Sequence, residues 1–311
     1  MPDRKDKILR ILASEQLKPS QNVINMCDKI KTRHEGRVQA FVYYGSSLRA
    51  MNDPEKMLDF YVLVDSYRKT HKSPLRVVIN SMLPPSVYYM ENANADGSIS
   101  NCKYSIISLP AFEKKCSGKA FLSVVWGRFS QPCVLLFPKS ESIKSRIQLA
   151  RSRGIRHVAN QTAPLFTGKT DAIKFWARGF MESYKTELRP ESSEARSEEI
   201  VARYEKRYGA LMETIYGKPD VQNLFAMPVA SSFNQMLCKL KWFGRRLLGK
   251  PVAAIRILSS AVTFDGGLDY VLHKLKNHSG VTIPVTEGQR RHPILWSPVL
   301  AWRLYRKGAF K

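Results

Sequence analysis

Apolar runs of two different periods divide the chain into a helical start, a β-rich middle and a helical second half. Residues 5–33 place apolar side chains three or four positions apart, and this spacing predicts helices. From 38 to 137 the runs are short, β-branched or aromatic, and bounded by Gly, Pro, Asn or Ser, which predicts strands. The expected strands are 38–44, 60–64, 75–79, 87–90, 104–108 and 133–137, with a helical interruption at 121–127.

After Pro138 the pattern returns to helical spacing. The expected helices run from Ser140 or Ser142 to about Arg153, from Asp171 to Leu188 and from Ser193 to Tyr216. Such a mixture predicts an α/β or α+β fold around one sheet. We expect three regions, which are 1–139 with the sheet, 140–232 with helices, and a basic region at 233–311.

Charge narrows the choice of partner. Fifty Lys and Arg against 26 Asp and Glu leave a net charge of +24. This balance predicts an anionic partner, which can be nucleic acid, an acidic membrane face or a phosphorylated small molecule. The part from residue 233 onward is very basic, with fourteen Lys and Arg against three acidic residues. The 44% of apolar residues can bury a sizeable core, which argues against global disorder.

Cysteines and histidines give no disulfide or metal pattern. The five cysteines are scattered and contain no C-x-x-C, so neither a disulfide framework nor a zinc site is expected. No stretch approaches the ~20 apolar residues that span a bilayer, and residues 1–13 lack a secretory pattern. We therefore expect an intracellular protein whose contact with membrane is peripheral.

A glycine-serine turn and a following aspartate form the candidate chemical centre. The strand 38–44 runs directly into Gly45-Ser46-Ser47. A glycine there lets the backbone turn, so that N–H groups and a serine hydroxyl reach phosphate oxygens. Twelve residues beyond Ser47, Asp59 opens the next strand, where a carboxylate can hold Mg²⁺. This spacing indicates the phosphate-and-metal corner of a nucleotidyltransferase, and an ordinary connection between two elements is the alternative.

A second metal ligand is harder to assign. Asp65 points to the same side of the strand as Asp59 and is a candidate, but six residues of extended strand span roughly 20 Å. One metal ion could bind both only if the strand broke between them, and Asp65 could instead be a turn residue. Many nucleotidyltransferases place two carboxylates two residues apart, yet those positions are Met57 and Tyr61 here. The other candidates for the second ligand are Asp53, Glu55 and Glu91.

The order of the motifs resembles a known family. Tyr44-Gly45-Ser46-Ser47, Met57-Leu58-Asp59-Phe60 and Val64-Asp65 are similar to the mitochondrial translocator assembly and maintenance family. Those proteins are peripheral CDP-diacylglycerol synthases (phosphatidate cytidylyltransferases). The likeness covers roughly residues 40–215. It continues in the same order with Val87-Tyr88-Tyr89, Lys103-Tyr104-Ser105-Ile106-Ile107-Ser108 and Gly127-Arg128-Phe129-Ser130-Gln131-Pro132.

The resemblance implies a fold and a reaction. The three regions would be a polymerase-β-like nucleotidyltransferase domain, a helical, winged-helix-like domain and a membrane-binding C-terminal segment. The reaction would join CTP and phosphatidic acid to give CDP-diacylglycerol and pyrophosphate, with Mg²⁺. The triphosphate would lie against Gly45, Ser46 and Ser47, and Asp59 would bind the metal. Lys103 and Arg128 would contact phosphate, because fixed cations suit the charge that develops in phosphoryl transfer.

Three positions depart from the pattern of the family. Ser47 stands where the family has the last glycine of Gly-Ser-Gly, and Gln131 stands where it has a lysine. Leu83-Pro84-Pro85-Ser86 replaces a glycine-containing lead into the Val-Tyr-Tyr motif. These departures suggest a distant bacterial branch, peripheral on the inner face of the cell membrane. In an organelle the corresponding place would be the matrix side of the mitochondrial membrane.

The C-terminal end has a pattern that suits a lipid surface. If residues 298–307 form a helix, three apolar side chains lie three positions apart on one side, with basic side chains beside them. Aromatic side chains with basic neighbours are typical of an interfacial helix. The alternative is a helix that packs its aromatic side on the protein's own core, and 233–256 allows the same two interpretations. The membrane-binding candidates are Trp302, Arg303, Tyr305, Arg306 and Lys307.

Two other function classes fit part of the pattern. One is a polymerase-β-like enzyme that acts on RNA, another protein or a small alcohol, and its charge would then bind nucleic acid. We find no aromatic-basic RNA-recognition motif, so nucleic acid is not the expected partner. The other is an inactive descendant that serves as an adaptor, because no second carboxylate stands two residues from Asp59.

Overall fold

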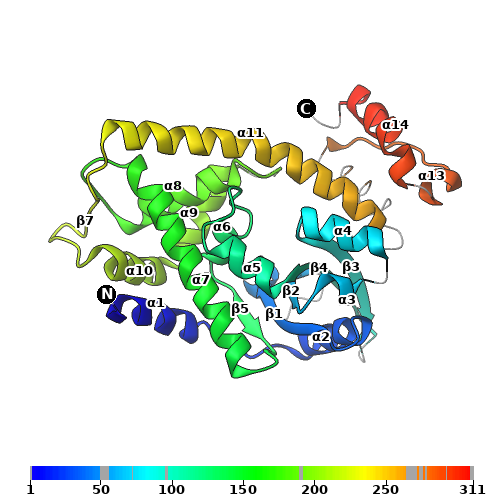
Figure 1. Cartoon of the computed structure of the whole chain (residues 1–311), viewed down its shortest axis with the longest axis horizontal. Helices are drawn as coiled ribbons and strands as arrows, with labels where there is room; N and C mark the ends of the chain where they lie inside the picture. The colour runs from blue at the N-terminus through cyan, green and yellow to red at the C-terminus, as the bar shows by residue number, and fades with distance from the viewer. Residues whose placement is uncertain are drawn as a thin grey trace.

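The computed structural model describes residues 2–49, 56–71, 73–94, 97–188, 192–263, 272, 276, 279–291 and 293–308. The fold is mixed α/β, 57% helical, with a five-stranded mixed sheet (Figure 1). The predicted fold class, a mixture of helices around one principal sheet, is confirmed at this level.

The strands of the sheet follow the order β3-β4-β2-β1-β5. Strands β2 and β4 are parallel, whereas the other three neighbouring pairs are antiparallel. These segments are rich in β-branched and aromatic residues, which pack well on a pleated surface. The bounds are β1 Val38–Tyr44, β2 Leu58–Val64, β3 Ser86–Ala93, β4 Ile99–Ser108 and β5 Val134–Leu136.

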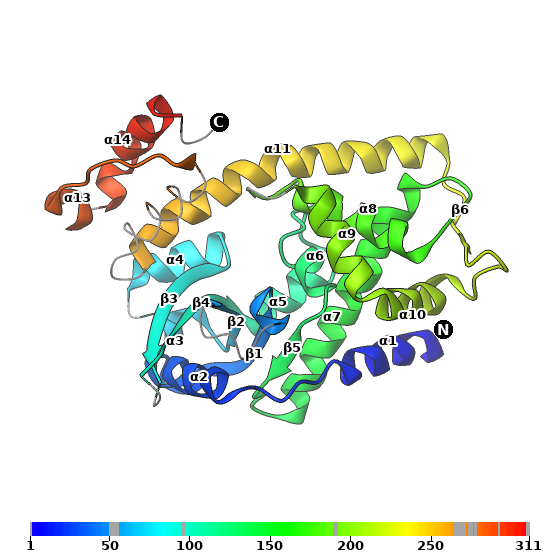
Figure 2. The ribbon, with the colours of Figure 1, turned by 180° about the vertical axis from the view of Figure 1, so that it is seen from behind.

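Helices cover both faces of the sheet. Helix α2 (Gln21–Arg33) buries its apolar stripe against one face (Figure 2). The other face packs on α5 (Leu109–Cys116), α6 (Trp126–Phe129) and α7 (Glu141–Thr162). The hydroxyl oxygen of Ser140 caps α7, so this helix begins after Ser140 rather than after the alternative start two residues later.

A second apolar core lies among the helices of the following region. Trp176 and Phe180 stack in its centre, with ring centroids 5.9 Å apart. A small two-stranded sheet of β6 and β7 borders this core. The elements are α7, η2 Ala163–Leu165, β6 Lys169–Thr170, α8 Ala172–Tyr184, α9 Ser193–Arg203, α10 Glu205–Tyr216 and β7 Phe225–Ala226.

The N-terminal helix α1 (Pro2–Ser14) packs on the helical core and not on the sheet. Ile8 and Leu12 are buried there, next to α7 and α10. Just beyond α1, Glu15 pairs with Arg151 of α7 and with Arg207 of α10, at 2.5 and 2.6 Å. Helix α1 belongs to the expected region 1–139, but it packs with the helices of the following region rather than with the sheet.

The long helix α11 (Ser232–Thr263) runs across the molecule and links its two parts (Figure 1). Trp242 is buried in the helical core, whereas the helix also contacts β3 and α14 (Pro293–Arg306). Gly249 marks a close approach, since a Cβ there would lie 2.3 Å from the carbonyl oxygen of Thr186. A short helix α13 (Glu287–Arg291) precedes α14. In the part of the chain that the structure describes, no helix is long and apolar enough to cross a bilayer.

Three expected elements differ from the observed ones. The expected strand at 75–79 is wrong, because this segment is helix α4 (Pro74–Met82). Pro74 at its first turn and apolar residues three to four apart favour a helix over the short β-branched run. The expected helix at 193–216 is divided at Tyr204 into α9 and α10. Within 121–127 only the last two residues are helical, as the start of α6. Between β2 and α4 lies a further short helix, α3 (Tyr67–Thr70).

Candidate active site

The turn after β1 has the geometry that the sequence predicted. Gly45 follows the last residue of β1 and has φ +88°, in the left-handed region that favours glycine. A Cβ at this position would lie 2.8 Å from Oδ2 of Asp59. The glycine therefore serves two purposes, because it permits the turn and leaves room for the carboxylate. The backbone of the turn and the side chain of Asp59 lie in direct contact.

Asp59 and Lys103 face each other across two parallel strands. Asp59 is the second residue of β2, and the register pairs it with Tyr44 on one side and with Lys103 on the other. The Nζ atom of Lys103 lies 3.2 Å from Oδ1 of Asp59. The fold thus brings together three residues that the motifs singled out, Gly45, Asp59 and Lys103, although 58 positions separate the first from the last.

The two serines of the turn have different environments. Ser46 is exposed, so its side chain is accessible to a ligand. Ser47 is fully buried at the start of the short helix η1 (Ser47–Arg49). Its Oγ has no hydrogen-bond partner among the described residues. Of the predicted triphosphate contacts, Ser46 is the accessible one, and Ser47 carries an unsatisfied oxygen beneath the turn.

Arg128 reaches the same corner from α6. Its guanidinium lies 5.2 Å from the ring centroid of Tyr44, the residue before Gly45. Its Nη2 atom lies 3.1 Å from Oε2 of Glu187. Burial lowers the pKa of Arg128, but the Glu187 carboxylate and the nearby tyrosine hydroxyls outweigh it and raise the pKa above its ordinary value. Arg128 is therefore a fixed cation. Its Nε is buried without a hydrogen-bond partner in the described part of the structure.

A small cavity of about 60 Å³ adjoins Gly45 and Arg128. The hydroxyl of Tyr184, from α8, donates to Oε1 of Gln131 at 2.9 Å across this cavity. Arg196 of α9 also lines it. Ligand pockets usually measure roughly 300–1,000 Å³, so a nucleotide would require these side chains to move apart. The cavity lies where the sheet meets the helices, and both parts contribute polar groups.

Two further charged residues belong to this corner, and the sequence patterns did not assign them. Glu187 follows α8 and holds Arg128 in place. Arg256, from the inward side of α11, lies close enough to Tyr61, Glu187 and Arg128 to interact with their charges. No motif marks either residue, since each is brought in by a helix from another part of the chain. Contacts between distant segments, rather than local spacing, identify them.

Asp65 is not part of this site. It follows β2 at the end opposite to Asp59, and the strand is continuous over Leu58–Val64. Its carboxylate pairs with Arg37 at 3.4 Å and accepts the backbone N–H of Ser66 at 2.7 Å. The strand does not break between the two aspartates, so the candidate Asp65 does not share a metal ion with Asp59. The alternative of a residue at the turn after the strand fits its position.

Of the two described carboxylates at this corner, Asp59 lies against the turn and Glu187 pairs with Arg128. Among the described residues, no group of three His, Cys, Asp or Glu side chains could hold a metal. Glu91 is exposed on β3 and accepts a hydrogen bond from Tyr89, and the candidates Asp53 and Glu55 lie outside the described residues. Oδ1 of Asp59 is buried and faces the ammonium group of Lys103 at 3.2 Å, although no described residue donates it a hydrogen bond. Mg²⁺ commonly binds one or two carboxylates together with substrate phosphates, so Asp59 fits that role.

Four of the five C-terminal candidates lie on α14, as the spacing predicted, and Lys307 follows its last residue. Trp302 and Tyr305 are 61% and 66% exposed, and their rings stack with centroids 6.2 Å apart. Arg303 and Arg306 are also exposed, and Lys307 donates from Nζ to the carbonyl oxygen of Thr282 at 3.1 Å. The aromatic side of α14 is therefore open, and among the residues of this helix whose side chains are described, Leu300 and Leu304 are buried. Contact with a membrane stays a prediction.

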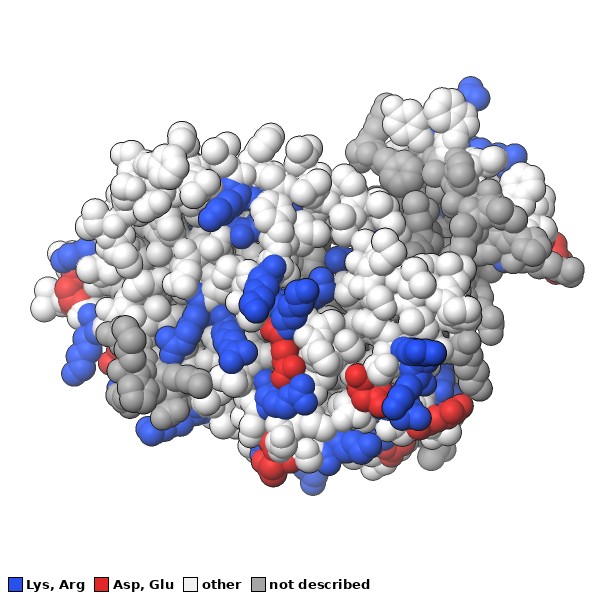
Figure 3. Space-filling model, in the orientation of Figure 1, with Lys and Arg blue, Asp and Glu red and all other residues white. Residues whose placement is uncertain are grey.

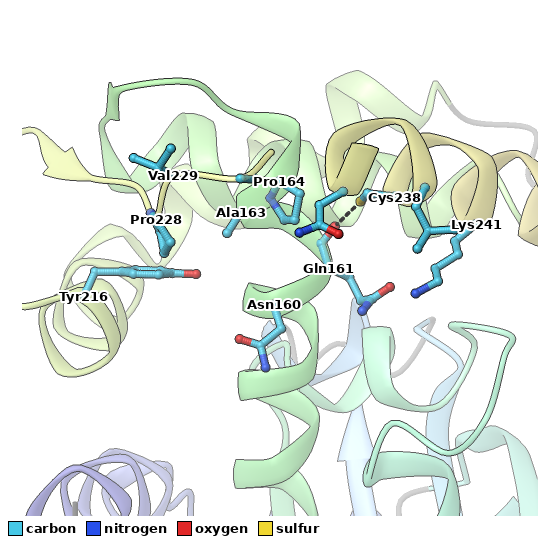
Figure 4. A pocket seen from close by; sticks show the side chains of 12 residues that line it. Asn160, Gln161, Ala163, Pro164, Tyr216, Pro228, Val229, Cys238 and Lys241 are labelled. Carbon is cyan, nitrogen blue, oxygen red and sulfur yellow. Dashed lines mark hydrogen bonds between the residues drawn. The ribbon is translucent and has the colours of Figure 1, made fainter. Parts of the chain in front are cut away.

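A larger cavity lies elsewhere. It measures about 360 Å³ and is lined by residues of α7, α10 and the start of α11 (Figure 4). Lys241 lies on one side and Tyr216 on the other, and Cys238 donates from Sγ to the carbonyl oxygen of Gln161 at 3.3 Å. No carboxylate is among the described residues that line it. It lacks the groups that phosphoryl transfer needs, so we place the candidate site at Asp59.

Comparison with known proteins provides no evidence on the function of this site. The chain matches no protein-family model, and no curated protein matches it. The resemblance to phosphatidate cytidylyltransferases rests on the motifs of this chain, and the function is inferred from them and from the geometry of the corner.

Proposed function

We propose that the protein is a Mg²⁺-dependent nucleotidyltransferase that transfers a cytidylyl group from CTP to phosphatidic acid at a membrane surface. The observation that carries the proposal is the contact between the Gly45 turn, Asp59 and Lys103, with Arg128 beside Tyr44. A turn with accessible N–H groups, a carboxylate and two fixed cations are the parts that such a transfer requires.

In the proposed reaction a phosphate oxygen of phosphatidic acid attacks the α-phosphorus of CTP. The bond to the β-phosphate breaks, and pyrophosphate leaves. The N–H groups of the Gly45 turn and the hydroxyl of Ser46 bind the triphosphate. Lys103 and Arg128 stabilise the negative charge that develops on the phosphoryl oxygens. Mg²⁺ held by Asp59 and the triphosphate would neutralise charge and align the reacting groups.

The choice of a lipid acceptor rests on two features. The ordered motifs resemble enzymes that use phosphatidic acid, and α14 exposes Trp302 and Tyr305 beside Arg303 and Arg306. Both features favour a substrate that lies in an anionic membrane. RNA would suit the net charge of +24 equally well, and its bases stack on exposed aromatic residues, so the ordered motifs are what favour the lipid.

One observation favours an inactive adaptor as the second candidate. Asp59 is engaged by Lys103, and the described residues provide no second carboxylate beside it. An adaptor would bind membranes without turning over any nucleotide.

The direct test incubates the protein with radiolabelled CTP, Mg²⁺ and vesicles that contain phosphatidic acid, and separates labelled lipid by thin-layer chromatography. We expect labelled CDP-diacylglycerol, its loss with EDTA, and little product from ATP, GTP or UTP. Labelling of an RNA 3′ end instead of the lipid would contradict the lipid acceptor. Membrane binding without turnover of any nucleotide would favour the adaptor.

A further inference from the structure

Helix α11 exposes a continuous apolar stripe along most of its length. Phe233, Leu240, Phe243, Leu247, Leu248 and Ile255 are at least half exposed or nearly so, and Phe243 and Leu247 reach 61% and 63%. At 100° per residue these positions fall within one side of the helix, since successive ones are three, four or seven residues apart, except for the adjacent pair Leu247 and Leu248. A patch of this kind on a protein marks an interaction site rather than an ordinary surface.

The charge around the stripe selects its partner. Helix α11 contains six Lys and Arg and no Asp or Glu. Lys239 and Lys250 are exposed beside the stripe, and Lys241 is exposed on its other side. In Figure 3 the upper edge over α11 is mostly white, with a few blue side chains. An anionic lipid bilayer has an apolar interior beneath negatively charged headgroups. Large apolar side chains can insert into that interior while the basic side chains beside them contact the headgroups.

The neighbouring helix α14 also exposes aromatic and basic side chains. Helix α14 contacts α11 and exposes Trp302, Tyr305 and Arg306. It too contains no acidic residue. Two adjacent helices that together combine exposed aromatic and aliphatic groups with basic charge form a larger surface than either helix alone. A terminal helix on its own would offer only a few anchoring side chains.

The opposite side of α11 faces the candidate active site. Trp242 and Gly249 point inward, and Gly249 contacts the backbone of Thr186, the residue before Glu187. Arg256 lies two turns beyond Gly249 on the same side and is partly buried near Arg128 and Glu187. The helix is therefore two-sided, with an outer apolar stripe and an inner cation at the corner that holds Asp59.

We propose that the outer stripe of α11 is the principal membrane-docking surface, and that an anionic bilayer lies against this stripe, on the side of the helix opposite to Arg256. This assignment goes beyond α14 and rests on the proposed function only for the identity of the lipid. A bilayer docked on the outer side of α11 would lie across this helix from the corner, and it would leave the Gly45 turn open to CTP from the aqueous side.

The test measures sedimentation of the full chain with phosphatidylcholine vesicles that contain phosphatidic acid. The variant Leu240→Glu/Phe243→Glu/Leu247→Glu replaces three exposed side chains and touches no buried residue. We expect its binding to fall by about tenfold or more, because apolar burial in the interface drives the docking. The matched control is Leu17→Glu/Ile99→Glu/Val221→Glu, which adds the same charge at exposed apolar positions outside α11. We expect the control to bind like the wild type.

Two further measurements separate this proposal from the others. With a soluble short-chain phosphatidic acid, the α11 variant should keep its turnover, whereas with vesicles it should lose turnover in step with binding. If no nucleotide is turned over at all, the sedimentation result still decides the docking surface. Unchanged vesicle binding by the α11 variant would overturn the proposal. So would a stripe that proves to join two copies of the chain, which light scattering would reveal as a dimer that the variant converts to monomer.

Discussion

At the scale of single residues, the corner depends on charges that neighbouring groups hold in place. Arg128 contacts the ring of Tyr44, at the end of β1, and the carboxylate of Glu187, just after α8. Its position is therefore set before substrate binds, which is how fixed cations stabilise developing charge. Lys103 is held in the same way, by its place opposite Asp59 in the sheet.

Variants at Arg128 and Glu187 should distinguish the contribution of Arg128 to turnover from its contribution to the stability of the fold. We expect Arg128→Ala to lower turnover by about 100-fold or more and to destabilise the fold by about 3 kcal/mol, since a buried ion pair loses one member. In Arg128→Ala/Glu187→Ala much of the stability should return while the activity does not. Chemical unfolding and CTP turnover measure the two quantities. Recovery of turnover in the double variant would show that Arg128 acts only on structure.

Two histidines should make the fold sensitive to mild acid. Burial lowers the pKa of His34 and of His157 to about 4, and nearby cations add to the effect. The unfolded chain, with a pKa near 6.5, binds more protons between these values, so stability should fall as pH drops from about 6.5 to 4. For His34, which is only 6% exposed, the full loss is about 3 kcal/mol.

Melting curves at several pH values test this expectation. His34→Gln/His157→Gln should have a lower melting temperature at neutral pH but a flatter dependence on pH between 6.5 and 4. An equal slope in the variant and the wild type would assign the acid sensitivity to other groups.

At the scale of elements, the close contact at the end of β1 decides the geometry of the turn. Gly45 combines a φ of +88° with a contact that leaves no space for a Cβ. We expect Gly45→Ala to destabilise the fold by about 1–2 kcal/mol and to abolish most of the turnover by displacing Asp59. The control is Gly209→Ala in α10, where a Cβ meets nothing within 4 Å. That change should stabilise slightly, by about 0.4–1 kcal/mol.

The elements also show what sequence patterns can and cannot predict. Strand β1 was predicted with its observed bounds, since its run is apolar and ends at Gly45. The turn and Asp59 were predicted because the motif is local. The segment of helix α4 was predicted as a strand, because a short run of branched apolar residues fits both the two-residue spacing of a strand and the spacing of a helix. Glu187 and Arg256 could not be predicted, because helices from distant segments bring them to the site.

At the scale of the whole molecule, a buried cluster of ion pairs holds the N-terminal segment against helices α7 and α10. Glu15 pairs with Arg151 and Arg207, and Arg207 also donates from Nη1 to the carbonyl oxygen of Ser130 at 3.0 Å. Ser130 precedes Gln131 in the Gly-Arg motif. The group therefore connects α1, α7 and α10 to the segment that carries Arg128.

Loss of the central charge in this group should weaken the whole fold. We expect Glu15→Gln to cost about 3–5 kcal/mol, because two buried guanidinium groups lose their carboxylate. The matched control is Glu113→Gln, which removes the more exposed pair with Arg146 and should cost no more than about 1 kcal/mol. Denaturant unfolding of both variants measures the difference. Equal effects would mean that Glu15 has no special structural role.

The two aspartates at the ends of β2 allow the most direct test of the central claim, that the corner at Gly45 and Asp59 is a nucleotidyltransferase site. The measurement is Mg²⁺-dependent release of pyrophosphate from CTP in the presence of phosphatidic acid. We expect Asp59→Asn to lower it by about 100-fold or more, and Asp65→Asn to leave it within about threefold. Equal losses in both variants, or full activity in Asp59→Asn, would contradict the account.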